Sequence, residues 1–295
     1  MCAKVSRPFW RSASRSGHLD SPLDRIRRIQ TVDDMVEQTP SLSGEEGSNV
    51  KSALRVLKVL EFFAQTRKPA TAADLRRHLD LPKSSCSALM ETLRRAGFLY
   101  PVGRESGYYP TRRWLELAHA VSENDPVLQA LEPMLEEVRD GSGETVILSK
   151  MMDQQVLYLD VVECTHEVRI AARSGELKPL YASAAGRALL STLPDEERAV
   201  LIKSLDYKPY TSATSKGPAE LEARIQAGLA QGWFLAIGEH RDDTISLSMP
   251  LQLGSQHYAV TIGIPRYRMD TKLEQSRLVL GKAVQAFQRQ HQGKV

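Results

Sequence analysis

Residues 81–97 decide the fold of the N-terminal part of the chain, and they read Leu-Pro-Lys-Ser-Ser-Cys-Ser-Ala-Leu-Met-Glu-Thr-Leu-Arg-Arg-Ala-Gly. Apolar residues recur in this stretch every three or four positions, which is the pattern of one buried helix face. That face comprises Cys86, Leu89, Met90, Leu93 and Ala96. Pro82 suits the first turn of the predicted helix because its missing N–H would have no partner there, and Gly97 suits the residue after its C-terminal end.

Two further helices are predicted upstream of this stretch. A linker over residues 41–49 ends in Asn49, a residue type that commonly caps a helix. Pro69 ends the helix that follows, and Thr71 with Asp74 forms a motif close to a capping box, which starts a short second helix. The apolar face of the first of these helices comprises Ala53, Val56, Leu57, Leu60 and Phe63.

A β-hairpin is predicted downstream, with strands at Phe98–Tyr100 and Tyr108–Pro110 around a turn at Val102–Gly107. The order helix, short helix, tight turn, helix, hairpin is that of a winged helix-turn-helix, whose second helix enters the DNA major groove with its N-terminal residues. Hydroxyls and backbone N–H groups at that end suit phosphate oxygens, and Ala88 can contact a thymine methyl. The candidates for DNA contact are Thr71, Lys83, Ser84, Ser85, Ser87, Ala88 and Arg104.

The charge of the chain is unevenly distributed. The whole sequence carries a net charge of +3 over 295 residues, which alone indicates no partner. Val50–Leu115 carries +8, whereas the residues before it sum to zero and those from Glu116 onward sum to −5. A basic module in front of a mildly acidic domain favours contact with nucleic acid.

The rest of the chain predicts a second domain of the α+β class. A helix over Arg112–Glu123 is apolar enough either to pack on its own domain or to form a dimer contact. From Glu144 onward hairpins alternate with helices, which is typical of an antiparallel sheet with covering helices. The predicted strands are Thr145–Lys150, Val156–Val162, Val168–Ala172, Trp233–Ile237, Ile245–Leu251 and Tyr258–Ile264. The predicted helices are Ala182–Leu190, Asp195–Leu205, Pro218–Gln231 and one opened by a capping box at Thr271–Glu274.

Composition and motifs exclude several classes of protein. No apolar stretch approaches the roughly 18 residues that can span a bilayer. The three cysteines, Cys2, Cys86 and Cys164, lie far apart, which argues against disulfides or a zinc ribbon and is typical of a cytoplasmic protein. We expect neither a metal site nor a cofactor. Known catalytic motifs are missing from the sequence, and Cys164 with His166 is a thin hint of an enzyme.

Several short motifs together resemble one known family. Each is weak alone, but their order and spacing are specific. They are Ser52–Leu57, Leu81–Ser84, Gly143–Val146, Tyr158–Asp160, Ala182–Leu190 and Gln231–Trp233. On these grounds the chain from Val50 to Val295 is similar to the isocitrate lyase regulator (IclR) family of bacterial transcription factors.

The resemblance implies a winged helix-turn-helix over residues 50–111, a linker helix over residues 112–126 and an effector-binding domain similar to GAF domains over residues 127–295. Residues 1–49 are expected to form a disordered tail. The resemblance also implies an effector pocket between the sheet and the start of the small-residue helix. The candidates for this pocket are Arg173, Ser183, Ala184, Ala185, Ser246, Thr261 and Gly263, with Ser248 and His240 as further polar groups.

The chain departs from the family pattern at three places. Ala88 stands where an Arg is frequent, Ala236 and Ile237 stand where many members have an acid pair, and Ser246 replaces a common Cys. Base readout and ligand chemistry are therefore expected to differ from those of the best-known members.

The sequence thus predicts a ligand-responsive transcriptional regulator rather than an enzyme. The resemblance implies a dimer or tetramer and a small organic or aromatic acid as effector. A dimer of this kind would bind a pseudo-palindromic operator, and we expect a repressor rather than an activator. Two alternatives remain. One is an α+β enzyme with a module that looks DNA-binding, and the other is a DNA-binding protein without a ligand.

Overall fold

The computed structural model describes residues 50–79, 81–103 and 107–291. These residues form two compact units, which divide between Pro110 and Thr111. The predicted tail over residues 1–49, its cap Asn49 and the DNA-contact candidate Arg104 lie outside the described residues. Within the described ranges, no helix is long and apolar enough to cross a membrane.

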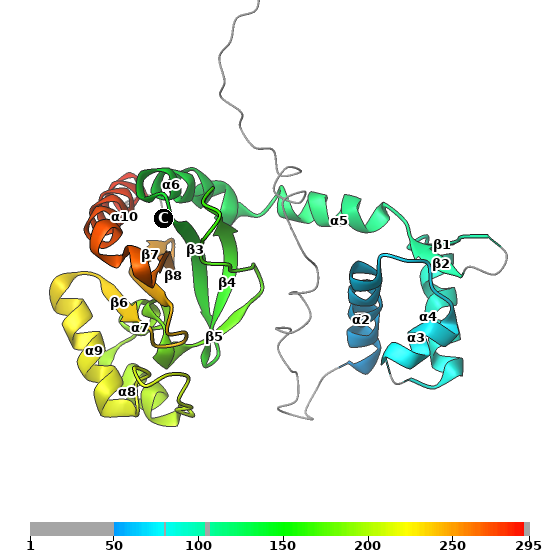
Figure 1. Ribbon diagram of the computed structural model, residues 1–295, viewed down its shortest axis with the longest axis horizontal. Helices are drawn as coiled ribbons and strands as arrows, with labels where there is room; N and C mark the ends of the chain where they lie inside the picture. The colour runs from blue at the N-terminus through cyan, green and yellow to red at the C-terminus, as the bar shows by residue number, and fades with distance from the viewer. Residues whose placement is uncertain (1–49, 80, 104–106, 292–295) are drawn as a thin grey trace, which may run out of the picture. The chain divides into compact units, whose positions relative to one another are not determined.

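The first unit is a winged helix-turn-helix, so the fold predicted for this part is confirmed. Figure 1 shows its three helices packed together with the hairpin at their side. The strands pair antiparallel with Tyr100 opposite Tyr109, and Gly97 follows the last helix in a left-handed conformation. The elements are α2 (Lys51–Thr66), α3 (Ala72–Leu79), α4 (Lys83–Arg95), β1 (Leu99–Pro101) and β2 (Tyr108–Pro110).

The core of this unit corrects one predicted helix face. On α2, Val59 and Phe62 are buried, whereas Leu57 is 56% exposed and Ala53 is exposed as well. The buried set is completed by Phe63, whose ring meets that of Tyr109 edge-on at 5.8 Å between centroids. Both faces have helical spacing, so periodicity could not choose between them; contacts of α2 with α3 and β2 select the one around Phe62 and Phe63.

The second unit is an α+β domain, as predicted. Its sheet has six antiparallel strands in the order β5-β4-β3-β8-β7-β6. The strands are β3 (Thr145–Met152), β4 (Gln155–Val162), β5 (Leu177–Pro179), β6 (Phe234–Ile237), β7 (Thr244–Leu253) and β8 (Gln256–Pro265). The helices are α5 (Arg113–Ser122), α6 (Pro126–Ser142), α7 (Ala184–Leu190), α8 (Asp195–Ser204), α9 (Pro218–Gln231) and α10 (Met269–His291), with short 3-10 turns η2 (Leu180–Ala182) and η3 (Arg266–Arg268).

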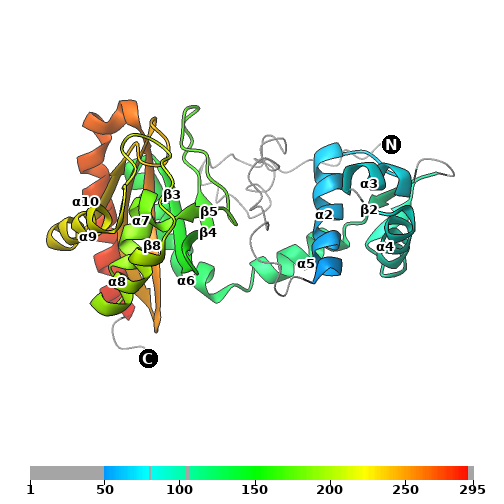
Figure 2. The same cartoon turned by 90° about the horizontal axis from the view of Figure 1, so that it is seen from below.

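The sheet separates two layers of helices, which Figures 1 and 2 show from two directions. α6 and α10 pack together on one face, and α7 packs on the other with α8 and α9 beyond it. Side chains alternate along β7 accordingly: Ile245 and Leu247 join the core under α6 and α10, whereas Ser246 and Ser248 belong to the α7 side. The α7 side of the sheet is therefore the one that carries small polar groups.

Two elements predicted for this unit are wrong. The segment between β4 and β5 contains no strand at Val168–Ala172: β5 pairs with Gln155–Leu157 of β4, and the Val168 carbonyl accepts from the Arg268 guanidinium (3.0 Å) instead of joining a sheet. Thr271 does not cap a helix, since α10 already begins at Met269 and the Thr271 hydroxyl donates back to the Arg268 carbonyl (3.1 Å). An i→i−3 bond of this kind is common inside the first turns of a helix.

Candidate functional site

The N-terminal half of α4 carries most of the predicted DNA contacts. Lys83, Ser84, Ser87 and Ala88 are exposed and Ser85 is half-buried. Cys86 anchors the helix between them without exposed surface, and burial raises the pKa of its thiol. Pro82 precedes the helix in an extended conformation (φ −55°, ψ 142°) instead of lying in its first turn. The hydroxyls and Lys83 thus gather at the helix end that enters the major groove in winged helix-turn-helix proteins.

Thr71, the remaining described candidate for DNA contact, is engaged in the fold. Its backbone N–H donates to Asp74 Oδ2 (2.9 Å) and its hydroxyl donates to the same oxygen (2.7 Å). The Asp74 backbone N–H donates in return to Thr71 Oγ1 (3.3 Å), which completes the predicted capping box. A DNA phosphate would have to compete with Asp74 for this hydroxyl, so the role of Thr71 at DNA stays a prediction.

The hairpin is fixed to the start of α3 by its second strand. Ala70 and Tyr108 exchange two backbone hydrogen bonds, of 3.0 and 2.8 Å. Gly107 precedes Tyr108 with φ +85°, and a Cβ there would overlap the Ala70 carbonyl and lie 2.7 Å from the Thr71 nitrogen. Glycine is therefore required where the wing approaches the helix-turn-helix.

The predicted effector-site residues on the last strands lie together on the α7 side of the sheet. Ser246 is opposite Gly263, and Ser248 is opposite Thr261, in the antiparallel register of β7 and β8. The two hydroxyls of the second pair are 2.9 Å apart. Together these residues form a face of short side chains, which suits the approach of a small ligand.

The start of α7 meets this face. The Ser183 hydroxyl caps α7 by accepting from the Gly186 N–H (3.0 Å), and the Ala184 N–H donates to Ser246 Oγ (3.4 Å). Ala184 and Ala185 are almost completely buried. A Cβ on Gly186 would overlap the Leu180 carbonyl, so close packing of η2 under the helix depends on this glycine. The structure therefore brings Ser183 and Ala184 next to Ser246.

The segment over residues 163–176 covers part of the same face. Ile170 packs on Gly263, where a Cβ would lie 3.1 Å from two Ile170 carbons. Cys164 is buried, and the Thr145 hydroxyl donates to its sulfur (3.8 Å). Arg173, the remaining predicted effector residue, lies in the turn before β5, where its carbonyl accepts from the Glu176 N–H (3.2 Å). Contact of its side chain with an effector stays a prediction.

His240 lies beside a group of polar and aromatic side chains. Its ring centroid is 4.6 Å from that of Tyr210, and burial followed by the charges of Lys178 and Arg241 lowers the pKa of His240 to about 4. The imidazole is therefore neutral near pH 7, with one nitrogen that donates and one that accepts. Lys178 pairs with Glu176 (2.9 Å) and lies 5.9 Å from the ring centroid of Tyr158.

A buried ion pair that sequence reasoning missed holds α7 to the loop after β6. Arg187 is 1% exposed, and its guanidinium donates to both carboxylate oxygens of Glu239 (2.8 and 3.0 Å) and to the Leu235 carbonyl. Arg224 adds a second ion pair to Glu239 (2.8 Å). The signal was a single Arg within the small-residue helix Ala182–Leu190, but nothing local indicates a partner 52 positions away.

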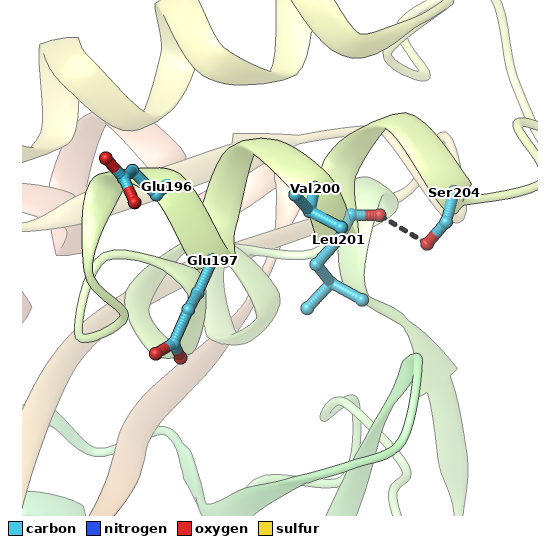
Figure 3. A pocket seen from close by; sticks show the side chains of 5 residues that line it. All are labelled: Glu196, Glu197, Val200, Leu201 and Ser204. Atoms are coloured by element: carbon cyan, nitrogen blue, oxygen red, sulfur yellow. Dashed lines mark hydrogen bonds between the residues drawn. The ribbon is translucent and has the colours of Figure 1, made fainter.

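A hollow on the surface of this unit is separate from the polar face. Figure 3 shows it along α8, where Leu201 and Ser204 follow Glu197 toward the end of the helix. Its lining consists of Glu196, Glu197, Val200, Leu201 and Ser204. None of the predicted effector residues belongs to this lining, so the hollow is not the predicted site.

Comparison with protein families assigns both units. The family model described as the C-terminal domain of bacterial transcriptional regulator IclR matches residues 119–290. The model of the IclR helix-turn-helix domain matches residues 52–103. The second model ends at Gly103, so it covers the helices and the first strand of the wing.

Two similar proteins are also transcriptional regulators. The transcriptional repressor IclR of Escherichia coli (strain K12) is 31% identical over 199 residues, which cover 65% of this chain and 70% of that protein. The HTH-type transcriptional regulator KipR of Bacillus subtilis (strain 168) is 28% identical over 217 residues, which cover 72% of this chain and 85% of that protein.

Solved structures share the fold. The crystal structure of Thermotoga maritima IclR matches with a TM-score of 0.69 at 20% identity and covers 82% of this chain and 99% of its own. An IclR homolog from Microbacterium hydrocarbonoxydans, complexed with 4-hydroxybenzoate, matches with a TM-score of 0.63 at 22% identity and covers 81% of this chain and 99% of its own.

These matches decide between the classes considered for the sequence. Cys164 is buried and His166 is exposed, and the matching family consists of DNA-binding transcriptional regulators, not enzymes. The prediction of a regulator is therefore confirmed, and the enzyme alternative is wrong. With its helix-turn-helix and its C-terminal domain both matched, the chain belongs to the IclR family of bacterial transcriptional regulators.

Proposed function

We propose that this chain is a repressor whose operator affinity is changed by a small organic or aromatic acid. Residues 50–111 would bind DNA, residues 112–126 would form the linker, and residues 127–295 would bind the effector. Two copies, or two pairs of copies, would read a pseudo-palindromic operator with half-sites about one helical turn apart. The effector can act only by binding DNA-competent and DNA-incompetent states with different affinity.

The observation that carries the proposal is the polar face under α7. Ser246, Ser248 and Thr261 place three hydroxyls on the side of the sheet that faces α7, and Ala184 directs its backbone N–H to the first of them. Hydroxyls and backbone N–H groups are suitable partners for a carboxylate or a phenol oxygen. A ligand here would take the place of Ile170 over Gly263.

The chemistry around this face favours a small acid. Burial, followed by the charges of Lys178 and Arg241, lowers the pKa of His240, so two cations lie near this ring; Lys178 is paired with Glu176 and Arg241 with Asp243. Relatives support the same class: the Escherichia coli relative is named a repressor, and the Microbacterium hydrocarbonoxydans homolog was crystallised with 4-hydroxybenzoate.

A thermal-shift screen of small aliphatic and aromatic carboxylates tests the proposal. An acid that binds the folded domain must raise its unfolding temperature. The hit is then titrated into a complex of the full-length protein with the duplex that it selects from a random DNA library, and fluorescence anisotropy should show release. Light scattering on the same sample should give a dimer or a tetramer.

A matched pair of variants locates the effector. Ser246→Ala should weaken binding of the hit by about tenfold, which is the loss of one hydrogen bond to a charged group. Ser255→Ala, in the exposed turn between β7 and β8, should leave binding unchanged. If the protein selects a DNA duplex but no acid raises its unfolding temperature, the alternative of a DNA-binding protein without a ligand is favoured instead.

A further inference from the structure

Glu91 lies on the side of α4 that points away from the core. Cys86, Met90 and Leu93 are buried, so residues about half a turn away from them face outward. Ser87, Glu91 and Arg95 follow one another at intervals of four residues and form one stripe on that outward side. Ser87 is among the predicted DNA contacts, and Glu91 comes one turn later.

The Glu91 carboxylate holds two arginines at once. Arg94 donates from Nε (2.7 Å) and from Nη2 (2.8 Å), one bond to each carboxylate oxygen. Arg95 donates from Nε to Oε1 (2.7 Å). None of these bonds uses the Nη groups of Arg95, whose side chain is 76% exposed. We name the three residues together the Glu91 fork.

The Glu91 fork is charged at every pH at which DNA binding is measured. Hydrogen bonds from Arg94 and then Arg95 lower the pKa of Glu91 to about 2. The fork therefore carries a net charge of +1, whereas the two arginines alone would carry +2. A carboxylate beside the DNA backbone is repelled by phosphates and lowers the net positive charge that attracts DNA of any sequence.

We infer that Glu91 is a positioning residue for DNA selectivity. It holds Arg94 and Arg95 in one arrangement, and on DNA whose groups do not match that arrangement its carboxylate repels the phosphates. Arg95 is held at Nε and presents its two Nη groups as a fixed pair of donors, which suits a phosphate or the guanine edge bidentately. Less side-chain freedom is lost when such a pair binds. The inference rests on the proposed binding of a specific operator.

The test compares two DNAs with the full-length protein. One is the duplex that wild type enriches from a random library, and the other is a mixed-sequence duplex of the same length. Glu91→Ala should tighten binding of the mixed-sequence duplex, steepen its salt dependence by about one to two units of slope, and lower the ratio of the two affinities by about tenfold. Glu91→Gln should act in the same direction, and unfolding curves confirm that each variant is folded.

Two comparisons separate position from charge. Glu91→Asp keeps the charge but is too short to engage both arginines, so it should leave the mixed-sequence affinity within about twofold and still lower the ratio. Glu61→Gln removes an exposed acid from α2, so it should strengthen binding to both duplexes alike and leave the ratio unchanged. With Arg94→Ala and Arg95→Ala already present, Glu91→Ala should no longer change the ratio.

The inference is overturned if Glu91→Ala and Glu61→Gln give the same ratio, or if Glu91→Asp behaves as wild type. It is equally overturned if Glu91→Ala lowers the ratio just as much after both arginines are removed. Failure of the wild type to enrich any duplex is a different result, because it contradicts the proposed operator binding and not the fork.

Discussion

Asp74 shows how a single carboxylate can decide where a DNA-binding element begins. Hydrogen bonds from the backbone and hydroxyl of Thr71, followed by the Arg77 guanidinium, hold the pKa of Asp74 below its ordinary value of 3.8. Its ionised form is therefore favoured in the folded state. The stability that this gives is complete above the ordinary pKa and is lost as the pH falls through the lowered one.

Asp74→Asn should lower the free energy of unfolding by about 0.5–1 kcal/mol at pH 7, since a helix cap is weakened and the site is partly exposed. The difference from wild type should stay constant down to about pH 4, near the ordinary pKa, and shrink below it. Urea unfolding of the full-length protein over a pH series measures this. Glu61→Gln, which removes an acid from α2, is the control. If its effect on the free energy of unfolding depends on pH as strongly as that of Asp74→Asn, the assignment is contradicted.

Whether a polar pair could be predicted from sequence depends on how far apart its members lie. Thr71 and Asp74 are three residues apart, so local spacing predicted the capping box. Arg187 and Glu239 are 52 residues apart and meet only because α7 packs against β6. The family resemblance, not spacing, brought Ser183 and Ser246 to one site. The structure adds the hydrogen bond from Ala184 that links them.

Helices and strands could likewise be predicted where the signals in the sequence are local. The helices α3, α4 and α9 and the hairpins β1–β2 and β3–β4 were predicted because their periodicity and their end residues are local. The strand predicted at Val168–Ala172 does not form; β5 pairs with Gln155–Leu157 of β4 instead, and the Val168 carbonyl accepts from the Arg268 guanidinium. The buried face of α2 failed in part because two overlapping faces satisfy helical spacing, and only α3 and β2 distinguish them.

The wing offers a test at the scale of an element. Gly107→Ala should cost about 1–2 kcal/mol for the left-handed backbone alone, with further loss from overlap with Ala70. The wing would then separate from α3, and DNA affinity should fall by about 5- to 30-fold. Anisotropy titration of the full-length protein measures the affinity.

The control for this substitution has the same backbone but no close neighbour. Gly175 has φ +87°, and a Cβ added there would have none of the described atoms within 4 Å. Gly175→Ala should therefore cost the conformational term alone and leave DNA affinity unchanged. Equal effects of the two substitutions on DNA binding would show that the contact between Gly107 and Ala70 does not position the wing.

At the scale of the whole molecule, the two units differ in net charge and are joined in sequence by one helix. The basic charge of +8 lies in the part that holds the winged helix-turn-helix, and the C-terminal part is acidic. The near-neutral total is therefore a sum of opposites and never argued against DNA binding. α5 joins the units in the sequence, and none of its residues is buried. The stability of this helix thus depends on its own backbone unless a partner covers it.

If the effector lowers operator affinity by some factor, thermodynamic linkage requires that the operator lower effector affinity by the same factor. We expect α5 to transmit this coupling. Replacing exposed Ala118 and Ala120 by Gly should weaken the helix by about 2 kcal/mol, because each Gly costs about 1 kcal/mol relative to Ala. Both coupling factors should then fall together toward one, while the affinities for isolated effector and isolated operator stay close to wild type.

Titrations of effector in the presence and absence of operator, and the reverse, measure both factors. The same pair of substitutions at exposed Ala227 and Ala230 of α9 is the control, since α9 lies within the C-terminal unit and does not join the two. Coupling lost equally in the α9 variant would mean that the response depends on the stability of the whole domain. If coupling survives in the α5 variant, it must follow a route other than this helix. A weakened α5 has nearly the same free energy in the DNA-competent and DNA-incompetent states and therefore cannot couple the two ligands.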